Sequence, residues 1–259
     1  MKDRVPDLSK ARVLISNDDG INAPGIKALE RVMKRIAGEV WVVAPEHEQS
    51  AAGHSLTLRS PLRIHKVSKH KYSVTGTPTD SVMLAVHEIM KDSPPDLVLS
   101  GINRGGNLGE DVTYSGTVAA AMEGTLLNIP SIAVSLVTPD GAKSHWKTAE
   151  QCIEQILYSL DGVKFPRGVL LNVNIPDCLF EQVTGIETTK QGRRKIGCEL
   201  LQGADPKGKP YFWIGAQRDE DKSLKGTDLE AVSRNAVSVT PLSLDLTHKS
   251  MMKTLKAAF

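Results

Sequence analysis

RVLISNDDG, residues 12–20, is the stretch that decides the fold. Arg12–Ser16 is a short apolar run rich in branched side chains, which favours a strand, and Asn17–Gly20 is a polar turn. The helical pattern of Ile26–Ile36 follows, and Val40–Ala44 is a second apolar run. A strand, a helix and another strand in this order are typical of a parallel sheet covered by helices. The stretch therefore predicts an α/β fold.

The same alternation continues through the first 175 residues. Further strands are predicted at Asp96–Ser100, Ser131–Leu136 and Val169–Ile175, and further helices at Thr79–Met90, Gly116–Leu127 and His145–Leu160. Each strand is mostly apolar, which indicates that both faces of the sheet are buried. We therefore expect an α/β core of residues 12–180, built as a Rossmann-like, mostly parallel sheet with helices on both faces.

The pattern changes after Asp177. Alternating stretches at Pro210–Ile214 and Ala236–Thr240 are separated by turns rich in glycine and lysine, which favours hairpins. We expect residues 181–259 to form a C-terminal β-hairpin and helix extension. Residues 1–11 are an N-terminal leader, to which the sequence assigns no role.

The composition is that of an ordinary globular protein. The chain has 259 residues, of which 40% are hydrophobic, and its 32 basic and 30 acidic side chains almost cancel. This balance argues against intrinsic disorder. No window reaches the roughly 18 to 20 apolar residues of a membrane helix, and Met1–Lys10 is too polar for a signal peptide. We expect a cytoplasmic protein that does not bind membranes.

Two adjacent acids, Asp18 and Asp19, follow the first strand directly. In an open α/β sheet, ligands bind at the carboxyl ends of the strands. The turn that Gly20 allows can direct both carboxylates at one cation, although an ordinary Asx turn has the same composition. The pair is therefore a candidate cation site, with the simple turn as the alternative.

A second polar loop, Pro45–Ser55, follows the strand at Val40–Ala44. It lacks the second histidine of an HExxH motif, so zinc-protease chemistry is not supported. We expect Glu46, His47 and Glu48 to be exposed loop residues. His54 lies among small residues, and an imidazole in that position suits general acid or base catalysis.

The third polar segment, Ser100–Thr117, leaves another strand and opens a helix. Ser115, Gly116 and Thr117 at that helix start offer hydroxyl and backbone N–H groups to an anion, although an ordinary serine cap has the same appearance. The glycines fit neither a Walker loop nor GxGxxG, so the segment does not indicate ATP or NAD binding.

The three loops together are more informative than any one of them. Their oxygen donors suit Mg²⁺ or Mn²⁺ better than zinc; the candidate ligands are Asp18, Asp19, Ser50 and Asn103. A phosphate beside the acids would also require such an ion. Repulsion between a carboxylate and a phosphate costs about 4 kcal/mol at 4 Å and an effective dielectric of 20. A helix N-terminus stabilises an anion by only about 0.3 to 2 kcal/mol.

Four segments in this order resemble the SurE family of survival-protein 5′-nucleotidases: Ile15–Ile21, Ala44–Thr57, Gly76–Asp80 and Ser100–Thr117. The resemblance implies a phosphatase that depends on one divalent metal ion and acts on nucleoside 5′- and 3′-monophosphates, often with exopolyphosphatase activity. It implies the same four metal ligands, and phosphate contacts from Asn103, Ser115, Gly116 and Thr117. It also implies a homodimer or homotetramer, made by exchanging C-terminal hairpins and helices.

The expected mechanism places Asp18, Asp19 and His54 in the catalytic machinery. The acids hold the ion that binds a phosphate oxygen, and His54 donates a proton to the leaving oxygen. Two alternatives stay open. The same loops can form a nucleotide-sensing module without catalysis, or the basic cluster Gln191–Lys195 can bind RNA. The second is weaker, because the 13 basic and 9 acidic residues of Thr184–Phe259 give a net charge of only +4.

Overall fold

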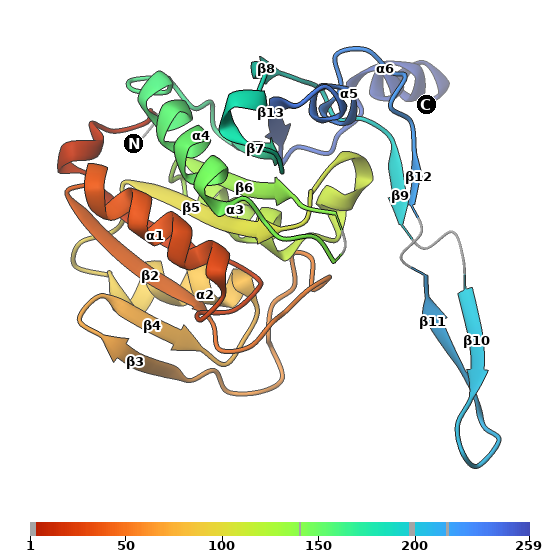
Figure 1. Ribbon diagram of the computed structural model, residues 1–259, viewed down its shortest axis with the longest axis horizontal. Coiled ribbons are helices and arrows are strands. Elements are labelled where there is room, and N and C mark those ends of the chain that lie inside the picture. The colour runs from red at the N-terminus through yellow and green to blue at the C-terminus, as the bar shows by residue number, and fades with distance from the viewer. Residues whose placement is uncertain (1–3, 140, 197–199, 216–217) are drawn as a thin grey trace.

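The computed structural model describes residues 4–139, 141–196, 200–215 and 218–259. A nine-stranded sheet forms its centre (Figure 1). The strands, in their order across the sheet, are β3 (Ile64–Ser68), β4 (Lys71–Val74), β2 (Glu39–Pro45), β1 (Arg12–Ser16), β5 (Leu97–Arg104), β6 (Ser131–Val137), β7 (Val169–Pro176), β13 (Ala236–Ser243) and β8 (Gly185–Thr188). The strands from β4 to β7 are parallel, whereas β3 and β13 run antiparallel to β4 and β7. The predicted mostly parallel sheet is confirmed.

Helices cover both faces of the sheet, as the sequence predicts. On one face, α1 (Pro24–Ile36) and α4 (Trp146–Ser159) share a hydrophobic core with the central strands. On the other face, α2 (Pro78–Leu84), the π-turn η2 (Ala85–Ile89) and α3 (Gly116–Leu126) pack against the same strands. No helix in the described ranges has the length and apolar character needed to cross a bilayer.

The strand order reverses between β1 and β5. The chain passes from β1 to β2 on one side of the sheet, and β5 later joins β1 on the other side. At such a reversal the loops that leave the two strands separate, and they leave a crevice outside the carboxyl ends of the strands. The polar turn after β1 and the segment after β5 therefore border one crevice.

The predicted elements of the core differ from the observed ones mainly at their ends. Strand β5 extends to Arg104, beyond the predicted end at Ser100. The single helix predicted at Thr79–Met90 is divided into α2 and η2. Thr77 caps α2, because its hydroxyl accepts the backbone N–H of Asp80 and the Asp80 carboxylate accepts that of Thr77.

The C-terminal residues divide between the main sheet and one projecting hairpin, which is built from two successive pairs of strands. Strands β9 (Arg194–Ile196) and β12 (Arg218–Glu220) pair with each other, as do β10 (Leu200–Ala204) and β11 (Pro210–Ile214), which extend away from the body (Figure 1). The expectation of a hairpin at Ala236–Thr240 is wrong. That stretch is part of β13, which lies inside the main sheet between β7 and β8.

The last two helices are short. Helix α5 (Asp228–Ser233) precedes β13, and the exposed α6 (Lys249–Ala258) ends the chain. Two 3-10 turns, η1 (Leu8–Lys10) near the N-terminus and η4 (Phe180–Gln182) after β7, lie at the edge of the core. Val5 and Leu8 of the N-terminal leader are buried in the core beside α1 and α4. The division at residues 11 and 180 and the role of the extension stay predictions.

Candidate active site

A cavity of about 440 Å³ opens at the crevice between the carboxyl ends of β1 and β5. Five of the predicted site residues line it together: Asp18, Asp19, Ser50, Asn103 and Ser115. The other lining residues are Glu48, Ala51, Arg104, Gly105, Gly106, Asn107, Asp111 and Tyr114. This volume lies within the usual range of small-molecule sites, about 300 to 1,000 Å³. Gly116 and Thr117 contact the lining residue Asp18 without lining the cavity themselves. His54 does not line the cavity either.

The N-terminus of α3 packs directly against Asp18. The hydroxyl of Thr117 donates a short hydrogen bond to the Asp18 carboxylate, and both side chains are buried. A Cβ at Gly116 would lie 2.7 Å from the Asp18 Cβ, so only glycine allows this approach. Ser115 caps the helix by accepting the N–H of Val118. The backbone N–H of Thr117 also acts on the Asp18 carboxylate, which leaves that of Gly116 as an anion donor.

Burial dominates the electrostatics of the two acids. It raises the pKa of Asp18, and the hydrogen bond from Thr117 opposes that shift. Burial also raises the pKa of Asp19 to about 7, and the neighbouring charge of Asp18 adds to the effect. In the described part of the chain neither carboxylate forms an ion pair. Arg104 opposes the shift of the Asp19 pKa through its charge and its backbone N–H, but burial outweighs it. The buried Asp18 and the partly buried Asp19 are therefore costly as anions, and a divalent cation would lower that cost.

The donor set fits a hard cation. The Asn103 amide nitrogen donates to the Gly105 carbonyl at 2.8 Å, which leaves its amide oxygen as the atom that can face a cation. Among the described residues, no three His, Cys, Asp or Glu side chains gather in a metal-binding arrangement. A cation at Asp18 and Asp19 would therefore need neutral oxygens, of the kind that Ser50 and Asn103 offer.

The loop after β2 is tied to both neighbouring segments. The Gln49 N–H donates to the Asp18 carbonyl at 2.8 Å, and the Gly53 N–H donates to the Tyr114 carbonyl at 3.0 Å. Ser50 donates to the Glu48 carboxylate at 2.7 Å. Glu48 is exposed, as expected, and it also lines the cavity.

His54 contacts α3 at a point away from the cavity lining. Its Nε2 lies 3.0 Å from Oε2 of Glu123, which is buried. The imidazole and the carboxylate therefore connect the loop that carries Ser50 to the helix that carries Ser115. The predicted role of proton donor stays a prediction.

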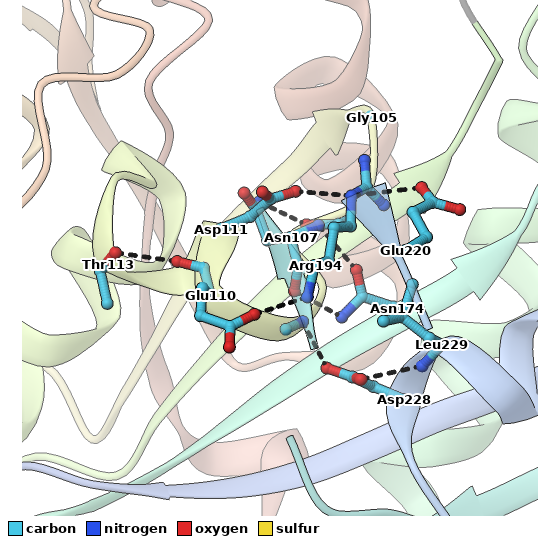
Figure 2. Close-up of polar contacts among 12 residues, drawn as sticks. Gly105, Asn107, Glu110, Asp111, Thr113, Asn174, Arg194, Glu220, Asp228 and Leu229 are labelled. Atoms are coloured by element: carbon cyan, nitrogen blue, oxygen red, sulfur yellow. Dashed lines mark hydrogen bonds and ion pairs between the residues drawn. The ribbon is translucent and has the colours of Figure 1, made fainter. Parts of the chain in front are cut away.

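The C-terminal extension packs against the cavity wall that contains Asp111 (Figure 2). Nε of Arg194, on β9, lies 3.0 Å from a carboxylate oxygen of Asp111 and 3.4 Å from one of Glu220. Asp111 lies in the 3-10 turn η3 (Gly109–Thr113) and lines the cavity. Only 6% of the Arg194 side chain is exposed. Arg194 is therefore unavailable to a nucleic acid at the surface, which weakens the RNA-binding alternative.

Asp228, the first residue of α5, connects the same wall to the C-terminal extension through its carboxylate. One of its carboxylate oxygens accepts the Gly109 N–H at 2.9 Å, and the other accepts the Gly192 N–H at 2.8 Å. The cavity wall is also tied to β7, because the Asn107 N–H donates to the Asn174 side chain at 2.9 Å (Figure 2). The segment after β5 is thus an ordered wall, although its glycines suggest a flexible loop.

The sequence did not assign five polar or charged lining residues to the site: Glu48, Arg104, Asn107, Asp111 and Tyr114. Arg104 could have been predicted from the local sequence, because it directly follows Asn103 at a strand end. The pairing of Asp111 with Arg194 could not be predicted locally, because it joins residues far apart in the chain.

Comparisons with known proteins agree with this fold. The family model for survival protein SurE matches residues 13–197. The 5′-nucleotidase SurE of Paramagnetospirillum magneticum is 60% identical over 255 residues, covering 98% of each chain. That of Rhodospirillum rubrum is 52% identical over 256 residues, again covering 98% of each chain. The crystal structure of the SurE protein from Aquifex aeolicus is 43% identical, with a TM-score of 0.84 over 95% of this chain and 99% of that one.

Proposed function

This chain belongs to the SurE family, and from that membership we infer that it is a 5′-nucleotidase, which hydrolyses nucleoside 5′-monophosphates to a nucleoside and phosphate. One observation supports this function most directly. The carboxylates of Asp18, which is buried, and Asp19, which is partly buried, meet the N-terminus of α3 at a single cavity. Carboxylates suit a divalent cation, and a helix N-terminus suits a phosphate. A phosphate ester held by both is positioned for attack by water.

We propose that the cofactor is one divalent cation, Mg²⁺ or Mn²⁺, held by Asp18, Asp19, Ser50 and Asn103. When bound, such an ion supplies positive charge to a phosphate oxygen and so stabilises an in-line displacement. Thr117 orients the Asp18 carboxylate through its hydroxyl. Ser115, Gly116 and Thr117 at the start of α3 orient the phosphate, and Asn103 contacts it from the end of β5.

Phosphate release from 5′-AMP tests the function. With Mg²⁺ or Mn²⁺ the native enzyme should release phosphate, and EDTA should abolish the release. Asp19→Asn and Asn103→Ala should each lower kcat/KM by about 100-fold or more. Asp92→Asn is the matched control, because Asp92 is an exposed acid outside the cavity. Full activity in EDTA, or undiminished turnover in both site variants, would refute the metal site.

The same assay separates the enzyme from a nucleotide-sensing module. Such a module would bind 5′-AMP with the metal ion, as calorimetry would show, yet release no phosphate. Nucleoside 3′-monophosphates and polyphosphate are the further substrates that we propose, and a screen over these compounds with several divalent ions tests that range.

We propose His54 as the proton donor to the leaving oxygen. To act in this way, its Nε2 must exchange the contact with Glu123 for one with the substrate. His54→Ala should then lower kcat and remove one limb of the pH profile. An unchanged rate and pH profile would exclude His54 from the chemistry.

We propose that residues 181–259 assemble the chain into a homodimer or homotetramer in the cytoplasm. Apolar side chains of the projecting hairpin and of α6 support this assembly because they are exposed; they include Leu200, Leu201, Phe212, Trp213, Met251 and Leu255. Sedimentation of the full chain should give a mass of two or four protomers.

A further inference from the structure

Arg104 is the one cationic side chain among the described residues that line the cavity. Its guanidinium group contacts the loop between β6 and α4: Nη2 donates to the Ala142 carbonyl at 2.8 Å, and Nε lies 3.3 Å from the Ser144 hydroxyl. These partners are neutral oxygens. Within the described ranges, no carboxylate lies at ion-pair distance from Arg104. The loop therefore orients the guanidinium without neutralising it.

The guanidinium keeps donors for a ligand. An arginine side chain has five N–H groups and stays charged at any physiological pH. The contacts with Ala142 and Ser144 use one N–H of Nη2 and that of Nε. The Nη1 group and the second N–H of Nη2 remain, and such a fork fits a phosphate.

The charges of the cavity require a cation of this kind. A divalent ion balances Asp18 and Asp19, and Arg194 pairs with Asp111. The phosphoryl group of a substrate then adds negative charge beside Glu48, which also lines the cavity. Arg104 is the lining residue that can offset it.

Arg104 and Ser115 contact neighbouring elements on opposite faces of the sheet. Ser115 begins α3, which packs on one face. Ala142 and Ser144 precede α4, which packs on the other face beside α1. Both residues nevertheless line the same cavity, so one ligand can contact the start of α3 and the guanidinium together.

We propose that Arg104 forms a second anion subsite, which binds the phosphate next to the scissile one in a phosphoanhydride chain. The inference rests on the proposed function, in which the scissile phosphate binds at Asp18, Asp19 and the start of α3. Single phosphates occupy that first position alone, whereas tripolyphosphate occupies both.

Inhibition of 5′-AMP hydrolysis tests the subsite with two probes, inorganic phosphate and tripolyphosphate, at a fixed concentration of free Mg²⁺. Arg104→Ala should raise the inhibition constant of tripolyphosphate by about tenfold, which corresponds to about 1.4 kcal/mol. The constant for phosphate should change by less than about threefold. Arg104→Lys should retain part of the tripolyphosphate affinity, because the charge remains while the planar fork is lost.

Arg35→Ala is the matched control, because Arg35 forms an ion pair with Glu154 on the outside of the helices. It should leave both constants unchanged. Equal weakening of the two probes by Arg104→Ala, or no weakening of either, would overturn the subsite. Calorimetric titration of tripolyphosphate into the Mg²⁺-loaded native chain and Arg104→Ala gives a readout without turnover. If the native chain releases no phosphate from 5′-AMP, the proposed function is refuted. If Arg104→Ala nevertheless binds tripolyphosphate more weakly than the native chain in the calorimeter, the subsite is supported.

Discussion

Nε of Arg194 lies 3.0 Å from the carboxylate of Asp111, and at most 10% of either side chain is exposed. The contact joins β9, at the base of the projecting hairpin, to a residue that lines the cavity (Figure 2). The backbone of Arg194 also donates to the Glu110 carboxylate, the residue next to Asp111. The C-terminal extension and the wall of the cavity are therefore one packed unit.

Arg194→Ala should destabilise the protein strongly. The change leaves the buried Asp111 carboxylate without this partner, and loss of one member of a buried ion pair costs about 3 to 5 kcal/mol. Urea unfolding gives the free energy. Arg234→Ala is the control, because Arg234 pairs with Glu187 and Glu230 at the surface, where solvent screens an ion pair and its loss changes stability little. Similar losses in the two variants would contradict this account of the Arg194 contact.

Thr117→Val should weaken metal binding. The Thr117 hydroxyl donates to Asp18, and loss of such a partner behind a metal ligand typically lowers metal affinity or activity by about 10- to 100-fold. Calorimetry with Mn²⁺ measures the affinity. Thr125→Val is the matched control on the same helix, because the hydroxyl of Thr125 is also buried but donates to the Ala121 carbonyl at 2.9 Å. We expect native Mn²⁺ affinity in that control; native affinity in Thr117→Val would show that its hydroxyl does not support the metal site.

Much of the core could be predicted from the sequence because parallel strands carry a strong local signal. A strand buried on both faces reads as an apolar run, and β1 has the predicted bounds Arg12–Ser16. The alternation at Ala236–Thr240 was correctly read as a strand, but a period of two does not identify the partner strand. That stretch pairs with β7 and β8 in the main sheet and does not form a second hairpin.

The candidate site followed from the same topology. Asp18, Asp19, Ser50 and Asn103 leave neighbouring parallel strands at their carboxyl ends, so the fold alone brings them to one edge. Contacts across the chain could not be predicted in this way. In the sequence, Arg194 belongs to the basic cluster Gln191–Lys195, which gives no sign that its side chain is buried. The packing of β9 against η3 buries it. His54 appeared near the strand ends, yet its partner is Glu123 on α3.

Trp213→Glu should reduce assembly without unfolding the chain. Trp213 lies on β11 of the projecting hairpin and is 68% exposed, so a charge there costs little in a single chain but much in a buried contact between chains. Sedimentation should show a lower mass, and circular dichroism should show a native fold. Leu58→Glu is the control, because Leu58 is 84% exposed on the core rather than on the extension. Native assembly of Trp213→Glu would exclude this hairpin face from the interface.

The raised pKa of Asp19 predicts how stability depends on pH in the metal-free protein. Burial, together with the charge of Asp18, raises the pKa of Asp19 to about 7 from its usual value of 3.8. Between these two values the folded chain keeps a proton that the unfolded chain has lost, so stability falls as the pH rises through this window. A bound cation needs the carboxylate form, so its affinity should rise with pH over the same window and level off above about 7.

Urea unfolding in EDTA at several values between pH 4.5 and 7.5 measures the fall in stability, and Asp19→Asn is the matched variant because its amide does not titrate. The fall should be steeper in the native chain than in Asp19→Asn. With saturating Mn²⁺ this fall should disappear, because Asp19 is then a carboxylate in both the folded and the unfolded chain and the pH-dependent rise in metal affinity offsets the loss. Identical pH slopes for the two chains in EDTA would show that Asp19 does not hold its proton in the folded state.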